Sequence, residues 1–207
     1  MKSDPDKGRG RKLRPRHFLF LPLLAGLWLL GDGLYIQAKA VAAQVLLERA
    51  WDRGVRSGRP AKAWSWADTW PVARLQVERL GIDLVVLEGV SGEALAFGPG
   101  RMAGLGPEYG SRTTLVAGHK DTHFRFLPNL KLGDEIVMQT LQGQNERYRV
   151  IGQEVIDYRA ASFEEDPFNP RLILVTCYPF DTLIVNGPLR YIVIAEKVAA
   201  ASAESAS

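Results

Sequence analysis

From Val72 onward the chain is a succession of short apolar segments separated by glycine, proline or acidic turns. In several segments polar and apolar residues alternate, as strands with one buried face require. Gln142 and Gly143 separate two of these segments and indicate a hairpin turn. The segments expected to form strands are Val72–Val77, Leu84–Leu87, Thr113–Gly118, Glu135–Leu141, Arg147–Val155, Arg171–Thr176 and Arg190–Lys197. About seven or eight strands with few helices predict a mainly β fold, either a small closed barrel or a sandwich.

Helical patterns are fewer and mostly precede the strands. Between residues 34 and 56 apolar side chains recur at helical spacing, and the segment from Gly54 to Pro60 ends the predicted helix. Short helical turns are expected near Gly92–Phe97, Thr122–Leu130 and Ala160–Asp166. The sequence shows no repeat of fixed period and no glycine loop of the kind that cradles phosphate.

The amino terminus combines a basic tail with an apolar segment. Residues 1–16 hold seven lysines and arginines against two aspartates, a balance of +5 within a formal charge of +3, which leaves −2 for the remainder. Cations before an apolar span keep the amino terminus in the cytoplasm. We therefore expect residues 17–36 to be a transmembrane signal anchor in the cell (inner) membrane, with the remainder on the extracytoplasmic, periplasmic side. The alternative is a cleaved signal peptide, because Ala38-Lys39-Ala40 resembles a cleavage site.

These features divide the chain and exclude several classes of protein. The expected segments are a basic cytoplasmic tail (1–16), the signal anchor (17–36), a helical stalk and linker (37–69), a β domain (70–198) and a disordered tail (199–207). The residues after the basic tail have a net negative charge, so the sequence predicts no basic surface that would bind nucleic acid. One cysteine excludes an internal disulfide and a multi-cysteine zinc site. The sequence indicates neither a metal site nor a cofactor.

The cysteine lies where a strand is expected to end. Cys177 follows the apolar segment Leu172–Thr176, and Tyr178-Pro179 cannot continue that segment as a central strand. A cysteine at the end of a strand is the first residue of a loop, so its thiol is accessible. The structural alternative, a buried and inert cysteine, would be more natural in the middle of the strand.

Two further residues have a similar placement. His119 follows the apolar segment Leu115–Gly118, and histidine can donate and accept protons near neutral pH. Arg190 begins the last expected strand, and its permanent charge and rigid donors suit an oxyanion. Taken singly, a histidine in the place of His119 is more often a surface or packing residue, and an arginine in the place of Arg190 is more often a solvated cation.

Together the three segments resemble the sortase family. Its signature is a strand that ends in threonine-cysteine, a glycine-histidine after an earlier strand, and an arginine on the strand after the cysteine. Leu174-Val175-Thr176-Cys177 matches the core of the cysteine motif, although Ile173 stands where threonine is common. The resemblance extends from about Trp70 to Val198. Gly118–Thr122 and Cys177–Phe180 look closest to the proteobacterial branch, class GN, with class D a near relative.

The resemblance implies a closed eight-stranded β-barrel with short helices, preceded by an amino-terminal membrane helix. It also implies a cysteine transpeptidase that cleaves a sorting motif near the carboxyl terminus of another exported protein. Cys177 would form a thioester, His119 would protonate the departing amine, and Arg190 would stabilise the oxyanion or position the substrate. An amine nucleophile then accepts the acyl group. The implied partners are the exported substrate, the amine acceptor and the membrane.

Three neighbouring residues each have a functional and a structural interpretation. Thr176 either donates a hydrogen bond to the substrate backbone or completes its strand. Asp121 either orients His119 or caps the turn that begins at Thr122. His123 lies four residues after His119 and could share a helical face with it as a metal pair, but no third ligand has suitable spacing.

Two other functions remain open from the sequence. A purely hydrolytic peptidase of the same fold is one, because water and amines compete for the same thioester. The other is an exported β-barrel that binds or scaffolds a partner and in which Cys177 is incidental.

Overall fold

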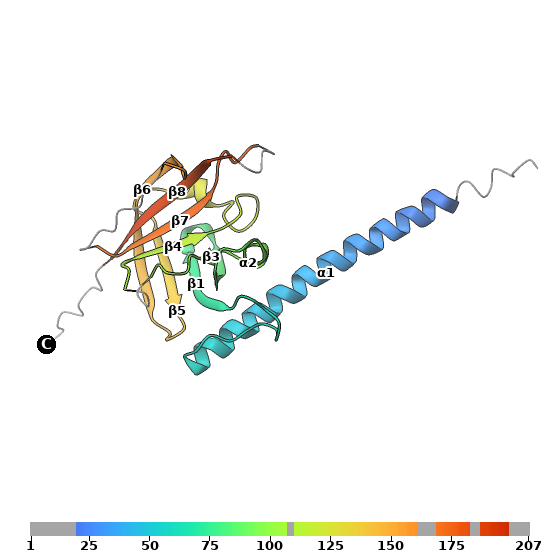
Figure 1. The fold of residues 1–207 in the computed structure, drawn as a ribbon, viewed down its shortest axis with the longest axis horizontal. Helices are drawn as coiled ribbons and strands as arrows, with labels where there is room; N and C mark the ends of the chain where they lie inside the picture. The colour runs from blue at the N-terminus through green and yellow to red at the C-terminus, as the bar shows by residue number, and fades with distance from the viewer. Residues whose placement is uncertain (1–19, 107–109, 161–168, 183–186, 199–207) are drawn as a thin grey trace, which may run out of the picture. The chain divides into compact units, whose positions relative to one another are not determined.

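The computed structural model describes residues 20–106, 110–160, 169–182 and 187–198, and the chain divides into two compact units, residues 1–42 and 43–207. The ribbon is shown in Figure 1. Its strands are β1 (Pro71–Val77), β2 (Ile82–Glu88), β3 (Gly100–Arg101), β4 (Thr113–Ala117), β5 (Glu135–Thr140), β6 (Asn145–Asp157), β7 (Arg171–Cys177) and β8 (Leu189–Lys197). Its helices are α1 (Phe20–Ser57), η2 (Glu78–Leu80), α2 (Gly92–Phe97) and η4 (Leu127–Asn129).

The strands close into an eight-stranded barrel in the order β1-β2-β3-β4-β7-β8-β6-β5, with β5 pairing back onto β1. The β2–β3 and β4–β7 pairs are parallel, and all other pairs are antiparallel. The expected mainly β fold is therefore confirmed, and closure selects the barrel over the sandwich. The hairpin at Gly143 is confirmed too, with Thr140 N donating to Gln144 O at 2.9 Å and a φ of +76° that favours glycine.

Alternation along the strands fills the barrel with apolar side chains. On β7, Leu172 and Leu174 point into the main core, while Ile173 belongs to a second cluster with Leu115 and Ile192. Because successive residues of a strand face opposite sides, Cys177 lies on the same face as Ile173, outside the barrel. Thr176 faces the interior.

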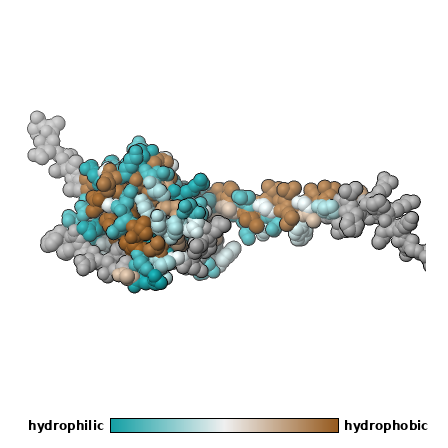
Figure 2. Space-filling view, turned by 90° about the horizontal axis from the view of Figure 1, so that it is seen from above, coloured by the Kyte–Doolittle hydropathy of each residue, from teal (hydrophilic) through white to brown (hydrophobic). Residues whose placement is uncertain are grey.

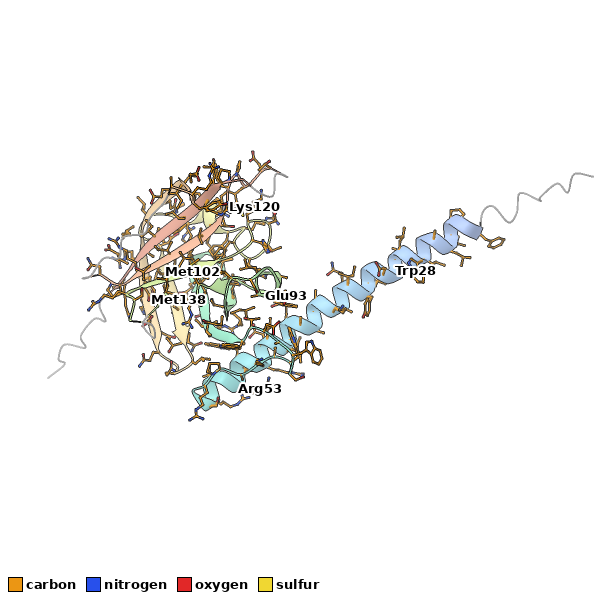
Figure 3. All side chains as sticks on the ribbon, viewed as in Figure 1. Trp28, Arg53, Glu93, Met102, Lys120 and Met138 are labelled. Atoms are coloured by element: carbon orange, nitrogen blue, oxygen red, sulfur yellow. The ribbon has the colours of Figure 1, made fainter. Side chains whose placement is uncertain are left out.

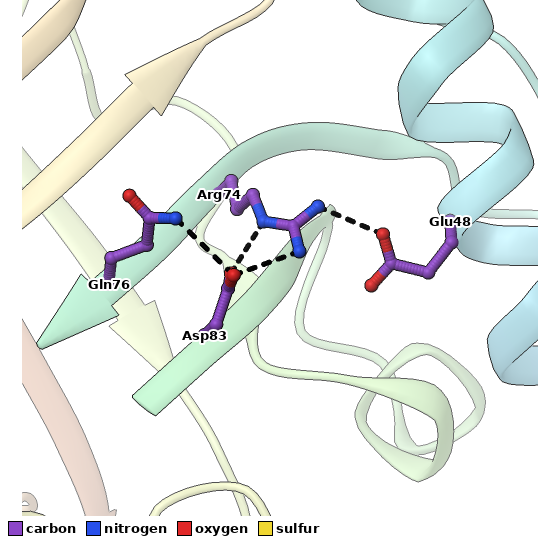
Figure 4. Close-up of polar contacts among 4 residues, drawn as sticks. All are labelled: Glu48, Arg74, Gln76 and Asp83. Atoms are coloured by element: carbon purple, nitrogen blue, oxygen red, sulfur yellow. Dashed lines mark hydrogen bonds and ion pairs between the residues drawn. The ribbon is translucent and has the colours of Figure 1, made fainter. Parts of the chain in front are cut away.

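The carboxyl-terminal part of α1 packs on the barrel. Leu47, Ala50 and Trp51 form an apolar cluster with Val85, Leu87 and other residues. Figure 4 shows the polar contacts beside this cluster, where Arg74 donates to Glu48 at 2.9 Å and pairs with Asp83. The helix ends at Ser57, and the next residue, Gly58, has a φ of +65°. The helix expected over residues 34–56 is thus confirmed and is the second half of a longer one.

Residues of α1 before Ala43 belong to the other unit and expose many large apolar side chains, among them Leu27, Trp28 and Leu34. Figure 2 shows these hydrophobic residues along the helix. Within residues 20–198, as far as they are described, no helix combines the length and the apolar character that a membrane span needs. The transmembrane helix expected at residues 17–36 stays a prediction.

The expected helical turns have different outcomes. Gly92–Phe97 forms α2, capped by Ser91, whose hydroxyl accepts from Ala94 N at 3.1 Å. The segment Thr122–Leu130 is a series of turns that includes the short helix η4. Most of Ala160–Asp166 and the tail at 199–207 lie outside the described residues.

Candidate active site

The topology brings three strand ends together at one end of the barrel. Strands β4 and β7 are parallel, so their carboxyl ends lie at the same edge, and the antiparallel strand β8 begins there. Ala117, the last residue of β4, pairs with Val175. His119 lies two residues beyond Ala117 in the following loop, and Cys177 lies two residues beyond Val175 at the end of β7. Cys177 itself pairs directly with Arg190 across β7 and β8. The structure therefore places Cys177 directly opposite Arg190 and brings the loop that carries His119 to the same end of the barrel.

Cys177 and Arg190 project from the same face of the sheet. Residues directly opposite each other on antiparallel strands have neighbouring side chains, with Cβ atoms about 4.5–5.5 Å apart. The thiol is partly buried and forms no disulfide. It lies at the end of an apolar strip on the outside of the barrel that includes Val175, Ile192 and Ile156. A substrate that lay along this strip would reach the thiol.

The guanidinium of Arg190 is held by its own loop and by an aromatic ring. Its Nη1 donates to Gly187 O at 2.7 Å and to Leu189 O at 2.8 Å. Its Cζ lies 4.6 Å from the ring centroid of Tyr158, a cation–π distance. Nε and Nη2 donate to no residue in the described parts of the chain. These two groups remain available to an oxygen of a bound substrate.

His119 is placed by its backbone. Its imidazole is exposed and makes no hydrogen bond with any described residue, but His119 O accepts from Phe124 N at 3.0 Å. The preceding Gly118 donates its N–H to Val175 O at 3.1 Å. A Cβ on Gly118 would lie 2.8 Å from the Phe124 ring, which explains the glycine before the histidine.

Thr176 and Asp121 take different places in the structure. Thr176 is 3% exposed, and its Oγ1 donates to Gly118 O at 2.6 Å, so the hydroxyl proton joins β7 to the loop that follows β4. Asp121 is exposed, and its carboxylate accepts no hydrogen bond from a described residue. A substrate contact from Thr176 or Asp121 stays a prediction.

His123 lies close enough to His119 for their charges to interact. Burial lowers the pKa of His123 below its ordinary value, and the positive charge of His119 lowers it further. His123 is therefore neutral near pH 7. In the described part of the chain, no three His, Cys, Asp or Glu side chains are grouped as a metal site would require.

Two residues at this site carried no signal in the sequence. Lys120 is only 9% exposed, and its Nζ donates to Pro179 O and Thr182 O. Tyr158 covers the Arg190 guanidinium. A lysine in a turn and a tyrosine at a strand end are both ordinary surface residues in sequence terms, so only the tertiary structure identifies them.

Comparison with known proteins agrees with this geometry. A family model described as the sortase domain matches residues 75–198, more than half of the chain, and the chain therefore belongs to the sortase family. Sortase D of Bacillus subtilis (strain 168) is 27% identical over 125 residues. That match covers 60% of this chain and 62% of the relative, so the chain spans less than two thirds of the length of this curated relative.

Solved sortase structures share the fold. Sortase C-1 from Actinomyces oris has a TM-score of 0.55 and 26% identity, covering 63% of this chain and 76% of that one. The sortase D5 transpeptidase from Clostridium perfringens has a TM-score of 0.59 and 20% identity, covering 77% and 99%. Sortase A from Corynebacterium diphtheriae has a TM-score of 0.57 and 23% identity, covering 67% and 66%. The last two are similar in fold alone.

Proposed function

We propose that this protein is a cysteine transpeptidase that cleaves a sorting motif near the carboxyl terminus of an exported protein and transfers the new acyl end to an amine. The observation that carries the proposal is the direct pairing of Cys177 with Arg190, beside the His119 loop. The sortase family to which the chain belongs supports the same activity.

The proposed reaction has two halves. In the first, the Cys177 thiolate attacks the carbonyl carbon after a threonine, and the oxyanion accepts hydrogen bonds from the free donors of Arg190. As the C–N bond breaks, the His119 imidazolium gives its proton to the departing amine and a thioester remains. In the second, an incoming amine attacks the thioester, His119 takes up its proton, and Cys177 leaves as the thiolate.

The test is intact-mass spectrometry of the full chain with peptides that have threonine at the cleavage position and randomised neighbours, in the presence of hydroxylamine. We expect a hydroxamate product, because hydroxylamine captures an acyl group held on sulfur, and a thioester adduct on Cys177 in a parallel reaction without hydroxylamine. Cys177→Ala should give neither, and Ser111→Ala is a matched control with a small polar side chain outside the site.

Each outcome separates the candidate functions. A carboxylic acid product in place of the hydroxamate would show a purely hydrolytic peptidase. Peptides left intact by a folded chain, with Cys177→Ala indistinguishable from wild type, would refute catalysis and favour a binding or scaffold role. The finer assignment, to class GN with class D as a near relative, stays a prediction from the segments around His119 and Cys177.

We also propose that residues 17–36 attach the enzyme to the inner membrane, with the barrel on the periplasmic side. The basic tail before this segment and the exposed apolar residues of α1 support the proposal. After alkaline carbonate washing, the full chain should stay in the membrane pellet, and a chain that starts at Ala43 should appear in the supernatant. Release of the full chain would contradict the anchor, and an intact mass that starts after Ala40 would show cleavage.

A further inference from the structure

The loop that follows β4 is tied to the loop that follows β7 by a buried cation. Lys120, which is labelled in Figure 3, is the residue directly after His119. Its Nζ donates to Pro179 O at 2.7 Å and to Thr182 O at 2.5 Å. Pro179 is two residues beyond Cys177. One ammonium group therefore connects the segment that carries the histidine to the segment that carries the thiol.

Burial of Lys120 strengthens its hydrogen bonds to Pro179 O and Thr182 O. A lysine at 9% exposure has lost most of its hydration, and an unpaired ammonium in such a place would be costly. Lys120 forms no ion pair with any described residue, so its hydrogen bonds to the two carbonyl oxygens compensate for the lost water. Separating the two loops would break both of these hydrogen bonds of the ammonium.

The His119 loop is held on both sides of the histidine. On the amino side, Gly118 bonds to Val175 O through its N–H and to the Thr176 hydroxyl through its carbonyl. On the carboxyl side, Lys120 bonds to the segment beyond Cys177. Because the imidazole itself has no hydrogen-bond partner among the described residues, its position relative to the thiol depends on these backbone attachments.

We propose that Lys120 is a positioning residue, which sets the separation of the His119 imidazole and the Cys177 thiol by fastening the two loops together. This role rests on the proposed function, since it matters for catalysis only if the two residues share a proton-transfer reaction. The Lys120 side chain does not contact a substrate in this proposal, because it is buried and its ammonium donates to the two carbonyl oxygens.

The first part of the test measures turnover. Lys120→Met keeps the length of the side chain but removes the ammonium, and misplacement of a catalytic group by about 1 Å can cost as much as 10²-fold. We expect kcat for peptide cleavage to fall about 10- to 100-fold, with a smaller change in KM. Lys120→Arg, which can still donate to both carbonyl groups, should restore part of the rate. Lys131→Met is the control, because the Lys131 side chain is exposed and makes no hydrogen bond with a described residue.

The second part is independent of peptide turnover. The rate of Cys177 alkylation by iodoacetamide, measured from pH 4 to 10, reports how the thiol ionises beside the histidine. In Lys120→Met the profile should move toward that of His119→Ala, and in Lys131→Met it should match wild type. Far-UV circular dichroism gives the folded fraction at the assay temperature, and rates are compared per folded molecule.

Either of two results would overturn the proposal. The first is a kcat of Lys120→Met within about twofold of wild type. The second is a lower kcat with an unchanged alkylation profile, which would make Lys120 a purely structural contact. A wild-type chain without peptide turnover would refute the proposed function instead. The alkylation profiles would then still decide whether Lys120 couples the thiol to the histidine.

Discussion

Arg190→Ala should lower the rate of thioester formation by about 10²- to 10³-fold, the range observed when one preorganised donor to an oxyanion is removed. The guanidinium is opposite the thiol in the β7–β8 pair, and Nε and Nη2 make no hydrogen bond with the described residues. Rapid-quench mass spectrometry of the Cys177 adduct measures this rate directly. Because alkylation by iodoacetamide forms no oxyanion, its rate should change far less.

Arg190→Lys distinguishes charge from geometry. Lysine supplies a positive charge but lacks the planar fork, and it could not reproduce both the carbonyl contacts and the stacking on Tyr158. We expect it to recover only part of the loss. Arg149→Ala, an exposed arginine on β6, should react like wild type. A loss of less than about fivefold in Arg190→Ala would rule out oxyanion stabilisation by this residue.

The sequence predicts most of this fold because its strands show either alternating polar and apolar residues, with one buried face, or a continuous apolar run, with both faces buried. Segments such as Arg171–Thr176 have a strong apolar pattern, and the observed β7 extends this prediction by one residue, to Cys177. The two-residue strand β3, Gly100–Arg101, was missed, because two residues show no periodicity and one of them is a glycine. It forms because β2 and β4 each pair with it.

The sequence predicts those parts of the candidate site that lie at the ends of strands. Parallel β4 and β7 necessarily bring their carboxyl ends together, so the His119 loop and Cys177 lie at the same end of the barrel once those strands are recognised as neighbours. The supporting contacts were not predictable. The burial of Lys120 depends on the path of the loop after Cys177, and the stacking of Tyr158 on Arg190 depends on the pairing of β6 with β8.

The largest stability effect is expected at Phe124, which links the His119 loop to the core. Its side chain is 0% exposed, and its ring packs edge-on against Phe126 at 5.9 Å and lies against Gly118. Phe124→Ala should lower the free energy of unfolding by about 3–5 kcal/mol, through lost burial and the cavity that remains. Guanidinium unfolding followed by circular dichroism measures the change.

Two variants make the Phe124 result specific. Phe124→Leu refills much of the space and should cost clearly less, whereas Leu132→Ala, at a residue 70% exposed, should stay within about 0.5 kcal/mol of wild type. Because the Phe124 ring lies against Gly118, directly before His119, the folded fraction of Phe124→Ala should also cleave peptide more slowly than wild type. Wild-type turnover per folded molecule, despite the lost stability, would mean that the histidine is held by Gly118 and Lys120 without the ring beneath it.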